Sequence, residues 1–167
     1  MKNLAIHPVL IFLLFLSFTS CKKVIDAVLD KPQTGSFNKY TIYTGEHYAD
    51  VKPYQQVAYE ELKFAVKFDS TAIYQTVQPQ NQEDINKLLG FSDNNAEHHD
   101  FSARVGWNWS RNALRLYAYV YNNSIRQAQE ITSVTIGSEI FCTIKVAGSK
   151  YIFSINNILV EMPRTSS

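Results

Sequence analysis

The stretch FSARVGWNWSRNALRLYAYVYNN, residues 101–123, alternates apolar and polar side chains through two successive segments. Successive side chains of a β-strand point to opposite faces of its sheet, so a period of two predicts strands with one buried face. Trp107 and Trp109 continue the apolar stripe of the first segment, and Leu114 and Leu116 belong to that of the second. Turn-forming residues lie between the two segments. The stretch therefore predicts an antiparallel hairpin.

The same alternation recurs before and after this hairpin, at residues 62–68 and 140–146. Five or six antiparallel strands are therefore expected across residues 101–162. Strands that repeat about every dozen residues favour an all-β antiparallel sandwich over an α/β fold. Only residues 82–89 are predicted as a short helix. Further hairpin turns are predicted at residues 122–124, 147–149 and 156–157.

The N-terminal segment MKNLAIHPVLIFLLFLSFTSC, residues 1–21, begins with the charge of Lys2 and continues into an apolar run from Val9. This run is about ten residues long, half of the ~20 that a helix needs to cross a bilayer. Its length matches the apolar region of a signal peptide. Residues 1–20 are therefore predicted to be a secretion signal and not a membrane span.

The end of this segment resembles the lipobox of bacterial lipoproteins. The resemblance implies cleavage before Cys21 and acylation of that residue, and several acyl chains hold a protein stably on a membrane. Phe18 stands where the pattern usually has an aliphatic residue, so cleavage by an ordinary signal peptidase is the alternative. Lys22 and Lys23 resemble neither the inner-membrane retention signal nor the surface-export signal of Gram-negative lipoproteins. The absence of both signals favours the outer membrane, with the domain facing the periplasm.

A second resemblance concerns the fold. IGSEIFCTIKVAGSKYIFSINNILVEM, residues 136–162, resembles the closing hairpins of concanavalin A-like, laminin G-like jelly rolls. Residues 87–109 and 114–123 are similar to uncharacterised lipoproteins of Gram-negative anaerobes built on such a domain. The resemblance covers roughly residues 56–162, and it implies a jelly-roll sandwich. Its motifs are structural, so it implies no catalytic residue.

These observations divide the chain into three parts. Residues 1–20 form the signal, residues 21–36 the lipidated cysteine and a tether, and residues 37–167 the β-sandwich domain. Similar domains continue through at least one more strand where this chain has only residues 163–167. We therefore expect a C-terminus that is truncated or frame-shifted and that leaves a sheet edge unprotected.

Composition narrows the choice of partner. The chain has 16 Lys and Arg against 15 Asp and Glu, and the signal contains one of these charges, Lys2. The remainder is electrically balanced, which disfavours nucleic acid and leaves glycan, protein or small-molecule partners. With Cys21 assigned to lipid, Cys142 stands alone and is predicted to be a small buried hydrophobic residue.

The polar loop SDNNAEHHD, residues 92–100, is dense in side chains that bind metals. Oxygen ligands suit calcium, and imidazoles beside carboxylates suit zinc or another borderline metal. A site for calcium or another divalent metal is one hypothesis, and no other cofactor is expected. A solvated loop is the alternative, because neighbouring histidines point to opposite sides of an extended backbone. The candidate metal ligands are Asp93, Glu97, His98, His99 and Asp100.

The face opposite the apolar stripe contains a second candidate site, for a glycan. A sugar ring stacks its C–H side on an aromatic ring and offers hydroxyl groups at its edge, so tyrosines beside hydrogen-bonding groups suit it. Alternatively, the tyrosines form the second half of the core and the tryptophans face outward. The candidate ligand-binding residues are Arg104, Asn108, Arg115, Tyr117, Tyr119 and Tyr121.

Catalysis has no support in the sequence. It contains no nucleophile elbow, no zinc-protease motif, no phosphate-binding loop and no C-x-x-C pair, so no catalytic residue is assigned. The predicted function is a membrane-anchored lipoprotein that binds a glycan or an envelope protein partner. Two alternatives stay open, a glycan-active enzyme of the jelly-roll type and a structural subunit of an envelope complex.

Overall fold

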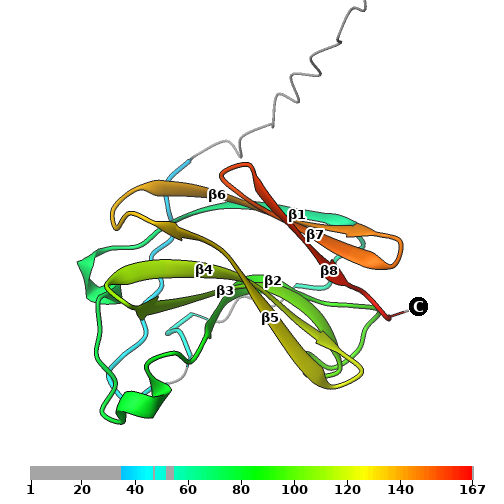
Figure 1. Ribbon diagram of the computed structural model, residues 1–167. Helices are drawn as coiled ribbons and strands as arrows, with labels where there is room; N and C mark the ends of the chain where they lie inside the picture. The colour runs from blue at the N-terminus through cyan, green and yellow to red at the C-terminus, as the bar shows by residue number, and fades with distance from the viewer. Residues whose placement is uncertain (1–34, 47, 52–54, 167) are drawn as a thin grey trace, which may run out of the picture. The chain divides into compact units, whose positions relative to one another are not determined.

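The computed structural model describes residues 35–46, 48–51 and 55–166, and Figure 1 shows that they form two facing sheets. Sheet A contains, in spatial order, β1 (Glu61–Lys67), β6 (Glu139–Ala147), β7 (Lys150–Ile155) and β8 (Ile158–Pro163). Sheet B contains β2 (Asn86–Ser92), β3 (Phe101–Ser110), β4 (Ala113–Asn122) and β5 (Ile125–Val134). The short 3-10 helices η1 (Ser70–Ala72) and η2 (Pro79–Asn81) lie between β1 and β2. All neighbouring strands are antiparallel, so the predicted all-β antiparallel class is confirmed.

The core lies between the two sheets because each strand buries one of its two faces there. Trp107 and Trp109 pack against this core. The tryptophan side of β3 therefore faces inward, and the tyrosine side of β4 is the outer face of sheet B. The fully buried core side chains are Ala103, Val105, Leu114, Leu116, Ala118 and Val120 from sheet B, and Ile140, Cys142, Ile144, Tyr151, Phe153 and Ile155 from sheet A.

The predicted number of strands is confirmed, since six strands, β3 to β8, lie across residues 101–162. Strands β2 to β5 follow one another within sheet B, and β6 to β8 follow one another within sheet A. The link from β5 to β6 crosses from one sheet to the other. β1 completes sheet A by pairing with β6, for example through Phe64 opposite Cys142.

Three hairpins are closed by two-residue turns that need a left-handed backbone at both positions. The φ angles are 51° and 58° at Arg111 and Asn112, and 46° and 74° at Asn156 and Asn157. Both central residues of a type I′ turn have positive φ, and this turn matches the twist of a hairpin. Asparagine tolerates the left-handed region better than most residues. The third such turn is formed by Asn123 and Ser124.

The predicted helix at residues 82–89 is wrong. These residues begin with the end of a 3-10 turn and continue into β2, which pairs with β3. Pairing with a long neighbouring strand outweighs the weak local preference of so short a segment. A register shift between Lys87 and Leu89 places Leu88 against the core, which breaks the alternation that would have marked a strand.

Cys142 confirms its prediction as a small buried hydrophobic residue. It is a free thiol within the core, and burial raises its pKa to about 12. A thiol with such a pKa forms almost no thiolate at neutral pH, so it is not a nucleophile.

No helix within the described residues is long and apolar enough to cross a bilayer.

Candidate functional site

The predicted glycan face divides into two regions along the outer face of sheet B. The segment before β2 covers part of this face at β3, where Ile85 packs on Gly106 and Glu83 O accepts a hydrogen bond from Asn108. A methyl group added to Gly106 would come within 2.5 Å of Ile85 Cγ2. The predicted residues Asn108, Arg115 and Tyr117 lie on one side of this segment, near the β3–β4 turn. Arg104, Tyr119 and Tyr121 lie on the other side.

The first region, which we call the turn end, satisfies its own hydrogen bonds. Asn108 is fully buried, donates from Nδ2 to Glu83 O at 3.1 Å, and accepts at Oδ1 from Tyr117 Oη at 3.1 Å. Arg115 forms an ion pair with Glu130, with 2.7 Å between Nη1 and Oε1. A ligand would have to break these bonds before it could use the same groups, so the turn end is a structural cluster.

The second region, which we call the open end, gathers side chains from five segments. They are Lys87 from β2, His98 and His99 from the β2–β3 loop, Arg104 from β3, Tyr119 and Tyr121 from β4, and Arg126 from β5, opposite Tyr121. Lys87 Nζ lies 3.0 Å from His99 Nε2 and 5.6 Å from the centroid of the Tyr121 ring. The His99 ring lies 5.2 Å from that of Tyr121. Cationic side chains from β2, β3 and β5 thus flank the aromatic rings of β4 at the open end.

Exposure separates the supporting residues of the open end from the accessible ones. Tyr119 is only 4% exposed, and burial, with neighbouring Tyr121, raises its pKa to about 12. It supports the surface from below. Lys87, His99 and Arg126 are exposed and Tyr121 is half-buried. These four side chains are the ones that a ligand can reach directly.

Sequence reasoning missed Lys87 and Arg126. Lys87 lay inside the segment predicted as a helix, so its face could not be assigned. Arg126 could have been found, because the predicted turn at residues 122–124 already indicates which residues pair across it. A two-residue turn that joins Asn122 to Ile125 places Arg126 opposite Tyr121, on the same face.

The predicted metal ligands do not converge. No group of three His, Cys, Asp or Glu side chains suited to a metal ion occurs within the described ranges. Asp93 points toward Tyr151 and Arg164, and Asp100 accepts a hydrogen bond from Ser124 Oγ at 2.7 Å. The His98 and His99 rings contact each other at a tilt of 55°, with 4.0 Å between their centroids, and Glu97 is exposed. Asp93 and Asp100 therefore have different partners, and neither is among the contacts of the two imidazole rings.

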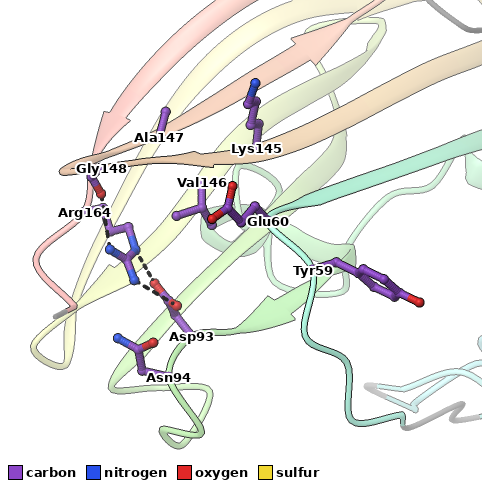
Figure 2. Close-up of a pocket in the computed structure, with 9 residues that line it drawn as sticks. All are labelled: Tyr59, Glu60, Asp93, Asn94, Lys145, Val146, Ala147, Gly148 and Arg164. Carbon is purple, nitrogen blue, oxygen red and sulfur yellow. Dashed lines mark hydrogen bonds and ion pairs between the residues drawn. The ribbon is translucent and has the colours of Figure 1, made fainter.

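A pocket of about 600 Å³ lies where the β2–β3 loop meets the β6–β7 turn (Figure 2). Its central contact is the ion pair between Asp93 and Arg164, with 2.6 Å between Oδ2 and Nε. Arg164 Nη1 also donates to Gly148 O at 3.2 Å, and Tyr151 Oη donates to Asp93 Oδ2 at 2.7 Å. The residues that line the pocket are Tyr59, Glu60, Asp93, Asn94, Lys145, Val146, Ala147, Gly148 and Arg164.

The electrostatics of this pocket are those of a structural ion pair. Burial opposes ionisation of Asp93, but hydrogen bonds from Arg164 and Tyr151 outweigh burial and hold its pKa below the usual value. Burial raises the pKa of Tyr151, and the hydrogen bond to the same carboxylate raises that pKa further. Both oxygens of Asp93 accept hydrogen bonds from Arg164. Asp93 is therefore a poor candidate for a general base, and it fastens sheet B to the end of sheet A.

Comparison with known proteins adds no relative. No family model, curated protein or solved structure matches the chain. Cys21 and the predicted signal at residues 1–20 lie outside the described residues, as does most of the tether at residues 21–36. The function is therefore argued from the geometry of the domain itself.

Proposed function

We propose that this protein is a binding module whose ligand is a glycan, held at the open end of sheet B. The observation that carries the proposal is the half-buried Tyr121 ring, flanked by the exposed His99 and Lys87. An aromatic ring fixed by its neighbours offers a stacking surface at little cost in conformational entropy. The open end is part of a broad sheet face, which suits a chain of sugars.

Replacing Tyr121 with alanine tests this proposal. We expect the variant to lose at least about tenfold in affinity for the glycan that the purified full-length protein selects from an array, because aromatic anchors dominate such interfaces. Tyr43→Ala is the matched control, since Tyr43 is a 63% exposed tyrosine in the described segment 35–46, which contributes no strand to sheet B. Equal loss in both variants, or no glycan bound by the parent protein, would rule out this site.

An envelope protein partner is the second candidate, and a specific observation favours it. In the described part of the segment that precedes β1, many large apolar side chains are exposed. Such surfaces commonly mark protein contacts. A protein that binds no glycan but loses its partner when these side chains are made polar would be the structural subunit. The residues concerned are Phe37, Tyr40, Ile42, Tyr43, Tyr48, Val51, Val57 and Tyr59.

A glycan-active enzyme is less well supported by the geometry. The pocket in Figure 2 contains two carboxylates, those of Glu60 and Asp93, but Asp93 is ion-paired with Arg164. A glycosidase needs one carboxylate as acid and another as base or nucleophile. Assay of hydrolysis products beside the binding screen separates an enzyme from a binding module.

We further propose that Cys21 anchors the protein to the outer membrane of a Gram-negative bacterium, with the domain in the periplasm. The finer fold, a concanavalin A-like jelly roll, is part of the same proposal. It is supported by two facing antiparallel sheets and by the consecutive closing hairpins β6 to β8.

Mass spectrometry of the mature chain tests the anchor. The N-terminal peptide is expected to begin at Cys21 and to carry acyl chains, and Cys21→Ser should release the protein from the membrane fraction. An unacylated terminus in the parent protein would instead make the domain a secreted one, cut by an ordinary signal peptidase.

A further inference from the structure

Three cationic side chains gather at the open end, although the chain as a whole is nearly neutral. Lys87, Arg104 and Arg126 come from three different strands, β2, β3 and β5, and all three lie on the outer face of sheet B. Their cross-strand partners establish the face: Lys87 lies opposite Gly106, Arg104 opposite Tyr119, and Arg126 opposite Tyr121. Residues paired directly across a sheet share one face.

The nearby carboxylates are engaged elsewhere or act on other groups. Glu130 is paired with Arg115, and Asp100 accepts a hydrogen bond from Ser124. The charge of Glu97 acts on His98 and raises its pKa, but larger effects lower that pKa overall. Within the residues that the structure describes, neither Lys87 nor Arg126 forms an ion pair with a carboxylate. Lys87 and Arg126 therefore present positive charge that no carboxylate contacts in the described part of the chain.

The neighbouring cationic groups also act on one another's pKa values. The pKa of Lys87 is lowered by burial and then by the charge of Arg104. The pKa of His98 is lowered by burial, and then by His99, Arg104 and Lys87. A bound anion would remove this repulsion, since an opposite charge within a few ångströms favours the charged form of each cation.

From this arrangement we propose that the ligand at the open end is an acidic glycan, whose sugar carboxylates lie over Lys87 and Arg126 while a ring stacks on Tyr121. This inference rests on the proposed function and names its ligand class. Charge complementarity selects an anion, and the aromatic rings between the cations select one that also has stacking surfaces. A free phosphate or sulfate ion would use the cations and leave Tyr121 and His99 without a role.

The test compares oligogalacturonate with its methyl ester, which has the same sugar chain without the charges. Using the purified full-length protein, we expect calorimetry to give at least about tenfold tighter binding of the acid, with affinity falling as salt is added. Lys87→Gln combined with Arg126→Gln should abolish the preference for the acid. Lys63→Gln is the matched control, because Lys63 is an exposed lysine of β1 in the other sheet.

The outcomes separate the two proposals. Equal binding of the acid and its ester would overturn the acidic-glycan inference and leave the glycan-binding function standing. Binding of neither, with a neutral glycan bound on the array, would also overturn the inference alone. Failure of every glycan would overturn both. If a sulfated glycan, an acidic peptide or single-stranded DNA binds more tightly than the uronate, the acidic-glycan inference is overturned. The ligand class is then the one that binds most tightly. The melting temperatures of the variants establish that each is folded.

Discussion

Replacing Asp93 with asparagine is expected to lower the free energy of unfolding by about 3 kcal/mol or more, because it removes one partner of a largely buried ion pair. The Asp93 and Arg164 side chains are only 9% and 15% exposed. Asparagine keeps the shape but leaves the guanidinium of Arg164 without its counter-charge, and the Tyr151 hydroxyl loses a charged acceptor. Urea unfolding of the purified protein, followed by tryptophan fluorescence, measures the change.

Glu61→Gln is the matched control for this prediction. It breaks the pair between Glu61 and Lys63, whose side chains are 38% and 37% exposed, and such pairs contribute at most about 1 kcal/mol. Equal losses in the two variants would show that the Asp93 pair does not fasten the sheets. Loss of folding in Asp93→Asn at room temperature would support the prediction, and Arg164→Gln should then fail in the same way.

The same ion pair gives the protein a defined response to acid. Because the pKa of Asp93 is lower in the folded chain than in the unfolded chain, its contribution is fully present above the unfolded pKa of about 4. That contribution is lost as pH falls through the folded pKa. The gap in stability between the parent protein and Asp93→Asn should therefore narrow as the pH is taken below about 4.

Replacing Gly90 with alanine is expected to cost about 1–3 kcal/mol and to weaken ligand binding as well. A Cβ atom at Gly90 would lie 2.5 Å from Arg104 Cα, 2.6 Å from Arg104 Cγ and closer still to the backbone oxygen of Ala103. Backbone atoms of a paired strand cannot move aside as a flexible side chain can, so β2 and β3 must separate locally. Arg104 belongs to the open end, so its displacement alters the proposed binding surface.

Gly35→Ala is the control for the second prediction, because nothing lies within 4 Å of a Cβ atom there and its backbone is not left-handed. We expect its unfolding free energy to stay within about 0.5 kcal/mol of the parent value. Thermal unfolding together with glycan affinity measures both effects of Gly90→Ala. An unchanged melting temperature would mean that the two strands separate at no cost, which contradicts the prediction.

The parts of the fold that could be predicted are those where burial acts on one face of a long strand. Residues 101–123 show this, since the alternation through Trp107 and Leu116 matches β3 and β4 and assigns their inner faces. β2 could not be predicted, because Gly90 and the irregularity at Leu88 interrupt its alternation and only pairing with β3 reveals it as a strand.

The candidate site could be predicted in outline and not in detail. Period-two logic places Arg104, Tyr119 and Tyr121 on one face, and the structure brings them together with Lys87 and His99. The same logic could not show that Ile85 packs on Gly106 or that Glu83 engages Asn108, because the path of a loop over a sheet depends on packing between distant segments. For the same reason, the pairing of Asp93 with Arg164 could not be predicted.

The pairing of β1 with β6 has a consequence for the order in which the chain folds. Every hairpin of sheet B and the two hairpins of sheet A join strands that are adjacent in sequence, whereas all of sheet B lies between β1 and its partner. Closing so long a loop is slow compared with forming a hairpin. We therefore expect β1, although it is made first, to be the last strand to join. A newly made chain would expose its apolar face until β6 has emerged, which gives a molecular chaperone a defined segment to protect.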